Sequence, residues 1–235
     1  MPTRFAGQLA LVTGGTGGLG RAVSLAFLKE GASVVATYRE QKELDDLQRA
    51  AATGAASLQG HRVDVTDVAA VDQFVERLIA ENGRLDVLVN TVGAYAGGTK
   101  LWESDPQVFE RMLALNLRSG YLLSRAVVPA MLQRGRGAIV NIASKAAIDH
   151  AAGAAAYVAS KAAAVAMIDS LAADLQGTGV RVNSVLPSII DTEANRRAMP
   201  NADFSKWPKP EEIATVILFL CSDDAKLIHG ASVPV

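Results

Sequence analysis

Several residue types that build disulfide-linked, metal-binding or nucleic-acid-binding proteins are scarce in this chain of 235 residues. The single cysteine, Cys221, excludes a disulfide within the chain. The three histidines, His61, His150 and His229, lie far apart without metal-ligand spacing, so we predict no metal site. A net charge of -1 at pH 7 provides no basic field for nucleic acid or for an anionic membrane.

Long apolar runs are also absent from the sequence. Residues 1–15 lack the apolar core of a secretory signal. The run at residues 162–168 is rich in alanine and much shorter than the roughly twenty residues that a spanning helix needs. Together with the scarcity of cysteine, this predicts a cytoplasmic protein with neither a membrane nor a nucleic acid as its partner.

Short β-branched runs alternate with longer amphipathic segments along the chain. This alternation predicts an α/β fold, a doubly wound parallel sheet of about seven strands with helices on both faces. No repeat, proline-rich linker or charge block divides the sequence, so residues 1–235 are expected to form one domain. Strands are predicted at residues 9–13, 33–37, 85–90, 137–142, 180–186 and 231–235, with another that begins at Val63. Helices are predicted at residues 21–30, 41–52, 68–81, 106–134, 154–176 and 210–222.

A glycine-rich segment, residues 13–20 (TGGTGGLG), lies between the first predicted strand and the first predicted helix. Glycine permits a tight turn and lets backbone N–H groups approach a phosphate, while a helix N-terminus favours negative charge. Gly14, Gly18 and Gly20 hold the key places of a G-x-x-x-G-x-G pattern, and Thr16 and Leu19 lie among them. The segment predicts a dinucleotide pyrophosphate site; the alternative is a flexible turn.

A second cluster carries acid–base chemistry. Tyr157 and Lys161 are four residues apart, so they share one face of the predicted helix. A nearby ammonium favours phenolate and is expected to lower the tyrosine pKa towards the working range. Ser144 follows a predicted strand, thirteen positions before Tyr157, and its hydroxyl can donate to a substrate oxygen. The alternatives are an exposed Tyr–Lys pair without a special role and a serine that caps a turn.

The glycine spacing, Ser144, Tyr157 and Lys161 together resemble the short-chain dehydrogenase/reductase family, and the resemblance covers nearly the whole chain. It implies a Rossmann-like core that binds NAD(P), with Tyr157 as the general acid or base of a hydride transfer. Lys161 would also bind the nicotinamide ribose. Asn116 matches the family position that holds a water in a proton relay through Lys161; its alternative role is a structural bridge.

The resemblance also implies further cofactor contacts. An acid-plus-apolar pair after the third strand would lie against the adenine, an Asn–Gly segment would follow the fourth strand, and a P-x-x-x-x-T segment would flank the nicotinamide. Thr91, Val92 and Ser188 depart from the usual family residues at these segments. Asp64 and Val65 form the acid-plus-apolar pair, and Asn90 and Gly93 belong to the Asn–Gly segment. Pro187, Ile190 and Thr192 belong to the P-x-x-x-x-T segment.

The end of the second predicted strand bears on the choice between NADP and NAD. An acidic residue there would bind the ribose 2′-hydroxyl and repel a 2′-phosphate. Residues 37–38 offer no carboxylate, and Arg39 follows them. A guanidinium binds phosphate through charge-assisted hydrogen bonds, so NADP is favoured over NAD. Glu40 next to Arg39 argues in the opposite direction.

The sequence predicts a small-molecule carbonyl or alcohol substrate without naming it. Residues 193–208 form a short substrate-covering loop, which suggests an open pocket for a flat or bulky substrate. Residues 191–207 resemble dihydropteridine reductases, whereas the site around Ser144 is similar to 3-oxoacyl-carrier-protein reductases. A catalytically silent NADP sensor is the rival class of function. His150 is expected in a surface turn, with the substrate pocket as its alternative position.

The resemblance further implies a homodimer or homotetramer. Relatives assemble through the two long helices, which here correspond to the predicted helices at residues 106–134 and 154–176. The alanine-rich face of the second would permit close packing between subunits, although it would serve equally well in the core.

Overall fold

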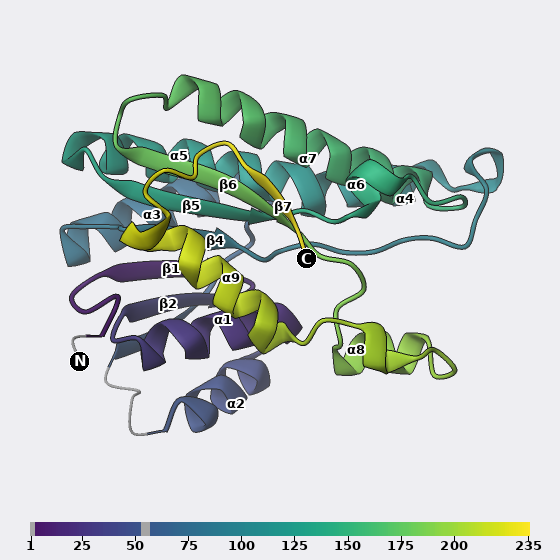
Figure 1. Ribbon diagram of the computed structural model, residues 1–235, viewed down its shortest axis with the longest axis horizontal. Coiled ribbons are helices and arrows are strands. Elements are labelled where there is room, and N and C mark those ends of the chain that lie inside the picture. The colour runs from purple at the N-terminus through teal and green to yellow at the C-terminus, as the bar shows by residue number, and fades with distance from the viewer. Residues whose placement is uncertain (1–2, 53–56) are drawn as a thin grey trace.

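The computed structural model describes residues 3–52 and 57–235. Within them, seven parallel strands form one sheet in the order β3-β2-β1-β4-β5-β6-β7 (Figure 1). The order reverses direction between β1 and β4, as in a doubly wound sheet. The strands are β1 (Leu9–Thr13), β2 (Ser33–Tyr38), β3 (Leu58–Arg62), β4 (Val87–Asn90), β5 (Gly137–Ile142), β6 (Val180–Leu186) and β7 (Ser232–Pro234).

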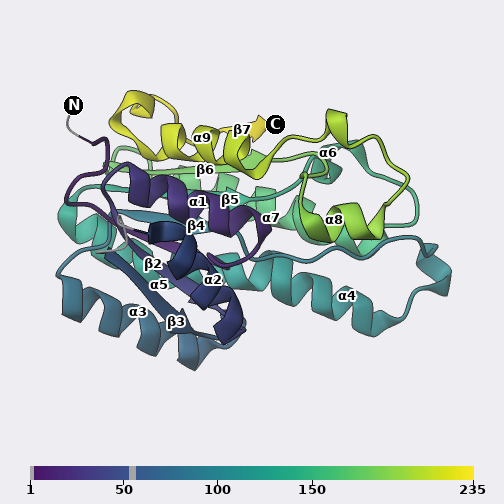
Figure 2. The same cartoon turned by 90° about the horizontal axis from the view of Figure 1, so that it is seen from below.

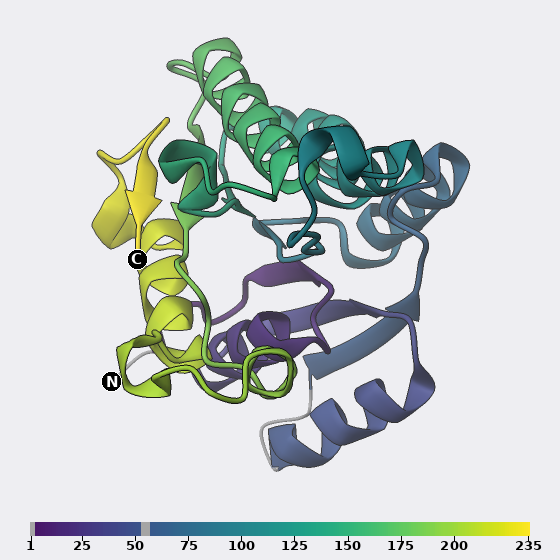
Figure 3. The same cartoon turned by 90° about the vertical axis from the view of Figure 1, so that its right-hand side faces the viewer.

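Helices cover both faces of the sheet, which confirms the predicted fold class (Figure 3). One layer contains α1 (Gly18–Lys29), α2 (Gln41–Ala51) and α9 (Pro210–Cys221). The other contains α3 (Val68–Asn82), α4 (Pro106–Leu113), α5 (Ser119–Arg134) and α7 (Ala155–Asp174). Two short helices, α6 (Ala146–Asp149) and α8 (Glu193–Ala198), follow the carboxyl ends of β5 and β6.

The apolar core is divided between the two faces by the period of two residues along each strand. In β1, Ala10 and Val12 belong to the cluster that includes Phe27 of α1, whereas Leu9 and Leu11 belong to the cluster on the α3–α5 side. Since β1 is buried at every residue, its sequence is a continuous apolar run, as expected of a strand covered on both faces.

Most predicted elements are confirmed, and β1, β5 and β6 have the predicted bounds. The prediction that the third strand begins at Val63 is wrong, because β3 ends at Arg62 and Val63 follows it. β3 (LQGHR) is an edge strand that pairs only with β2, so it has few apolar residues to reveal it. α1 begins at Gly18 rather than at residue 21, because the glycine-rich turn runs directly into the helix.

The long helix predicted at residues 106–134 has a wide turn within it. α4 runs into the π-helical segment Ala114–Arg118, which continues into α5. Single π turns of this kind often accompany functional sites. Here the wide turn contains the buried Asn116.

Helix α7 is, within the described residues, the helix long and apolar enough by length and composition to cross a membrane. The alanine-rich run at residues 162–168 is therefore part of a longer apolar segment than the sequence pattern suggested. In the structure, α7 packs against β6 and α4, in the helical layer over the sheet (Figure 1).

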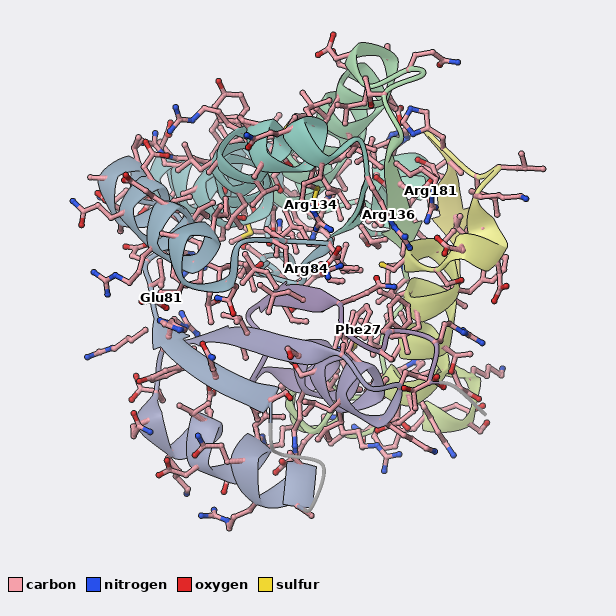
Figure 4. All side chains as sticks on the ribbon, turned by 90° about the vertical axis from the view of Figure 1, so that its left-hand side faces the viewer. Phe27, Glu81, Arg84, Arg134, Arg136 and Arg181 are labelled. Carbon is pink, nitrogen blue, oxygen red and sulfur yellow. The ribbon has the colours of Figure 1, made fainter. Side chains whose placement is uncertain are left out.

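A buried carboxylate joins strands and helices at the amino-terminal end of the sheet. Asp86 accepts a hydrogen bond from the backbone N–H of Leu9 at 2.8 Å. Arg84 donates to it through two nitrogens at 2.7 Å each, and Arg134 of α5 donates at 2.8 Å (Figure 4). Burial alone would raise the pKa of Asp86, but these hydrogen bonds outweigh it and lower the pKa. The network therefore stabilises the ionised carboxylate in the folded protein.

Replacing this carboxylate is expected to destabilise the fold. Asp86→Asn leaves two arginines without their partner, which should lower the free energy of unfolding at pH 7 by about 3 kcal/mol. Because folding lowers the Asp86 pKa, its contribution is fully present above the unfolded-state pKa of about 3.9 and is lost as the pH falls through the folded-state value. Urea denaturation from pH 7 to pH 3 should therefore show the variant and the wild type converging in acid.

The matched control is Asp72→Asn, which removes an exposed ion pair with Arg125. We expect this change to cost less than about 1 kcal/mol, because exposed pairs contribute little. Equal losses in the two variants would contradict the role assigned to Asp86.

Candidate active site

The glycine-rich turn lies at the carboxyl end of β1 and is fixed to β2. The N–H of Gly14 donates to the Thr37 hydroxyl at 2.9 Å, and the N–H of Gly15 donates to the Thr37 carbonyl at 3.1 Å. Gly14 has a left-handed φ of 65°, which favours glycine. A Cβ on Gly20 would lie 2.0 Å from the Gly14 carbonyl oxygen, so this approach of helix to turn excludes any side chain.

A groove of about 300 Å³ runs past this turn. It brings together the predicted cofactor residues Gly14, Thr16, Gly18, Leu19, Gly20, Arg39 and Gly93. Its other lining residues are Gly17, Thr37, Tyr38, Glu43, Val63, Thr91, Val92, Ala94 and Leu115. The groove meets the N-terminus of α1, where unpaired backbone N–H groups and the helix dipole favour an anion.

The predicted adenine contacts do not line this groove. Asp64 is exposed, and its carboxylate accepts from the Thr66 hydroxyl at 2.6 Å and from the Thr66 N–H at 2.9 Å. These hydrogen bonds lower the Asp64 pKa. Val65 is buried in the cluster under α3, whereas Val63, which was not predicted, is the lining residue from this segment.

The Asn90 side chain is hydrogen-bonded to neighbouring strands. It is buried, accepts from the Thr13 hydroxyl at 2.7 Å and donates to the side-chain Oδ1 of Asn141 at 3.0 Å. These bonds run across β1, β4 and β5, so the Asn90 side chain joins three strands beneath the groove. Its neighbours Thr91 and Val92, which depart from the family pattern, line the groove instead.

The P-x-x-x-x-T segment follows β6 and passes beside the glycine turn. A Cβ on Gly18 would lie 2.8 Å from the Thr192 methyl carbon, so Thr192 is next to the groove. The Thr192 hydroxyl accepts from the N–H of Asn195 at 3.2 Å and begins α8. Pro187 and Ile190 lie on this connection but do not line the groove. The α8 segment extends beyond the strands on the same side as α6 and the start of α4 (Figure 2).

The predicted reactive residues lie at neighbouring elements, Ser144 after β5 and Tyr157 and Lys161 on α7. Lys161 is buried, and its ammonium donates to the Ile142 carbonyl at 2.9 Å. Burial lowers the pKa of Lys161 to about 8. A Cβ on Gly93 would lie 3.1 Å from the Lys161 Nζ, which places the ammonium beside the groove.

The tyrosine pKa differs from the sequence-based expectation. Burial raises the pKa of Tyr157, the Ser144 hydroxyl opposes this rise, and the neighbouring Tyr95 adds to it. The expectation that Lys161 lowers this pKa is not met, because burial is the largest cause of the shift and raises it. The lysine ammonium donates to the Ile142 carbonyl. Ser144 and Tyr157 are nevertheless close enough for the serine hydroxyl to act on the phenol.

Asn116 makes the contacts of a structural bridge, one of the two roles that the sequence left open. Its side-chain Oδ1 accepts from the backbone N–H of Ala94 at 2.8 Å. Its side-chain Nδ2 donates to the backbone carbonyl of Ala94 at 3.0 Å and to the Ser160 hydroxyl at 2.9 Å. Ser160 in turn donates to the Tyr157 carbonyl at 2.7 Å. The π turn thus holds the segment after β4 against the helix that carries Tyr157 and Lys161.

Two neighbours of the predicted residues were missed. Glu43, in the first turn of α2, lines the groove and accepts from the Thr16 hydroxyl at 2.9 Å. Its spacing of four residues from Arg39 is the signal that was available in the sequence. The Tyr95 ring lies 4.9 Å from the Tyr157 ring, centroid to centroid, edge to face. No local pattern marks this contact, since it joins the loop after β4 to helix α7, which is distant in sequence.

The histidines take separate positions. His150 is exposed and ends α6 with a positive φ of 48°, in the turn that was predicted. His229 joins two elements, since its Nδ1 accepts from the Val182 N–H at 3.3 Å and its Nε2 lies 2.8 Å from the Ala172 carbonyl. Among residues 3–52 and 57–235, no cluster of three or more His, Cys, Asp or Glu side chains is placed to hold a metal ion.

Known proteins share this sequence pattern and this fold. The family model described as short chain dehydrogenase matches residues 8–203. D-threitol dehydrogenase of Mycolicibacterium smegmatis is 36% identical over 97% of this chain and 91% of its own length. The 3-oxoacyl-acyl-carrier-protein reductase of Thermotoga maritima is 33% identical over 97% of this chain and 95% of its own length.

Solved structures agree over nearly the full length. A short-chain dehydrogenase/reductase from Burkholderia xenovorans has a TM-score of 0.92 and 34% identity, and covers 99% of this chain and 96% of its own. ElxO with NADP bound has a TM-score of 0.92 and 26% identity, and covers 97% of this chain and 96% of its own.

The close approach at Gly20 gives a test of the glycine turn. Gly20→Ala places a Cβ against the Gly14 carbonyl, which should lower the free energy of unfolding by about 1–3 kcal/mol through overpacking. Gly17→Ala is the matched change, since its nearest neighbour would be 3.4 Å away and its φ of -73° suits any residue. We expect that variant to stay within about 1 kcal/mol of the wild type in thermal and urea unfolding. Equal stability of the two variants would contradict the packing assigned to Gly20.

Proposed function

Because the chain belongs to the short-chain dehydrogenase/reductase family, we propose that it transfers a hydride between NADP and a small carbonyl or alcohol substrate, with Tyr157 as the general acid or base. The family assignment makes the protein an NAD(P)-dependent oxidoreductase that acts on CH–OH or C=O groups. The observation that supports the finer proposal most is that the Ser144 hydroxyl acts on the Tyr157 phenol, while Lys161, one helical turn further along α7, lies beside Gly93 of the groove.

The residues of the groove fit a dinucleotide. Several of its lining residues are glycines at which a Cβ would meet backbone or neighbouring side chains, so the turn packs more closely than other residues would allow. Backbone N–H groups from Gly18 to Gly20 at the start of α1 would hold the pyrophosphate. The Arg39 guanidinium at the groove margin would hold the 2′-phosphate of NADP, with Thr192 beside the turn on the other side.

The reaction then requires a proton at the substrate oxygen. When bound, the nicotinamide supplies or accepts the hydride. In the direction of reduction, the Tyr157 hydroxyl gives its proton to the carbonyl oxygen, while the Ser144 hydroxyl donates a hydrogen bond to that oxygen. Because burial raises the Tyr157 pKa, the free protein keeps the phenol protonated at neutral pH, ready to act as an acid. The Lys161 ammonium, held by the Ile142 carbonyl, supplies a positive charge on the same helix as Tyr157. Asn116 holds the segment after β4 in place through Ala94.

We propose that Arg39 and Glu43 together set the preference for NADP. Arg39 is exposed at the groove margin and can reach a 2′-phosphate, whereas Glu40 does not line the groove. Glu43 lines it and is held by Thr16, so its carboxylate would repel the same phosphate. Arginine favours NADP, and the glutamate limits that preference.

The proposal of a homo-oligomer rests on apolar side chains exposed on helices α4 and α5. Phe109, Tyr121 and Leu132 on α4 and α5 are 40%, 53% and 41% exposed. We propose that residues 1–235 form one domain, which assembles as a homodimer or homotetramer through α4, α5 and α7. The cytoplasmic location remains a prediction of the sequence.

The role of Tyr157 has a direct test. Tyr157→Phe removes the proton donor and keeps the ring, so kcat for ketone reduction should fall by about 10²–10⁴-fold. Fluorescence titration should show the dissociation constant for NADPH unchanged within about threefold. Tyr121→Phe, on the exposed side of α5, is the control and should retain full turnover. Turnover retained by Tyr157→Phe would exclude it as the acid.

Cofactor preference has a separate test with both cofactors. Arg39→Ala should lower kcat/KM for NADPH by about 10–100-fold, the effect of losing one or two charge-assisted hydrogen bonds, and leave the value for NADH nearly unchanged. Glu43→Gln removes a negative charge from the groove and should raise kcat/KM for NADPH about fivefold. The control is Glu40→Gln, expected to stay within about twofold. A gain in Glu40→Gln without one in Glu43→Gln would contradict the assignment.

A further inference from the structure

An exposed aromatic ring lies directly on the proposed acid. Tyr95 is 68% exposed, although its ring is in edge-to-face contact with the Tyr157 ring at 4.9 Å and 72°. A large aromatic group left open to solvent beside a reacting hydroxyl provides apolar surface at which a ligand can gain contact.

This placement of Tyr95 is fixed from both ends of its segment. Both backbone polar groups of Ala94, the preceding residue, are hydrogen-bonded to Asn116. At the other end, the N–H of Thr99 donates to the Gly153 carbonyl at 3.2 Å, just before α7. A Cβ on Gly97 would lie 2.1 Å from the Tyr95 hydroxyl oxygen, so the absence of a side chain there lets the ring lie over the turn.

A second cavity is bordered by Tyr95. Its volume is about 480 Å³, and its lining combines Tyr95, Leu101 and Val108 with the charged side chains Glu103, Asp105 and Arg111. Ser144, Tyr157 and Lys161 do not line it. Tyr95 therefore touches the proposed acid and also borders a space that is large enough for the body of a small substrate.

We infer that Tyr95 is a substrate-positioning residue, whose ring forms a wall of the carbonyl site and favours ketones carried on a flat or cyclic apolar body over open-chain ketones. The inference rests on the proposed function, since it needs Tyr157 to act at the substrate oxygen. A ring next to that oxygen can stack against Tyr95, whereas a flexible chain must lose rotational freedom to make the same contact.

The test compares cyclohexanone with hexan-2-one, two ketones of six carbons, using NADPH as cofactor. Wild-type kcat/KM should be higher for cyclohexanone. Tyr95→Ala should raise KM for cyclohexanone about five- to tenfold, with kcat within about threefold and KM for hexan-2-one within about twofold. Tyr95→Phe should restore the wild-type values, because the ring makes the contact. Phe219→Ala, an exposed aromatic change on α9 in the opposite helical layer, is the matched control and should leave both substrates unaffected.

Other outcomes overturn the inference in distinguishable ways. Equal losses for both ketones in Tyr95→Ala, or a fall in kcat with KM unchanged, would mean that Tyr95 only supports Tyr157. A wild-type preference for hexan-2-one would reject the proposed substrate class. If the wild type binds NADPH and reduces neither ketone, while other carbonyl compounds are reduced, this inference fails and the proposed function stands. If no carbonyl compound is reduced, both fail.

Discussion

The carboxamide of Asn116 is the contact on which the geometry of the site depends. It lies in the π turn between α4 and α5, is buried, and uses its oxygen and its amide to hold Ala94 and Ser160. Ser160 extends the chain of hydrogen bonds to the backbone of Tyr157. A buried amide left without partners would cost roughly 1–3 kcal/mol, so the π turn, the segment after β4 and helix α7 are constrained to one arrangement.

The two ends of the sheet carry different kinds of polar interaction. At the amino end, both oxygens of the buried Asp86 carboxylate accept hydrogen bonds, and its two arginines balance its charge. At the carboxyl end, Thr13, Asn90 and Asn141 form a buried row of neutral hydrogen bonds. Next to this row, the groove meets the first turn of α1, whose backbone N–H groups favour an anionic ligand. This division follows from the parallel sheet, in which all strands end at the same edge and place their following loops together.

Much of this arrangement could be predicted from residues close together in sequence. Strands such as β5 and β6, almost entirely buried, are rich in β-branched apolar residues, and the glycine turn has a spacing of its own. β3 was misplaced because an edge strand needs little apolar surface. The π turn was invisible because one extra residue per turn barely changes a helical pattern. Tyr95 was missed because only tertiary structure brings it to Tyr157, whereas Glu43 follows Arg39 closely enough in sequence to have been considered.

Asn90 and Asp64 show what a sequence motif alone does not determine. A motif indicates which residues belong near the site, but not which atoms face it. In this structure the Asn90 side chain joins strands, and the Asp64 side chain is hydrogen-bonded to Thr66.

The segment from residue 94 to residue 99 is attached at one end to the π turn and at the other to the residues before α7. Its conformational entropy is therefore lost once, during folding, and not again in each encounter with a ligand. A ligand that enters beside Tyr157 meets a wall already in place, and more of its contact free energy remains available for holding it in a reactive orientation.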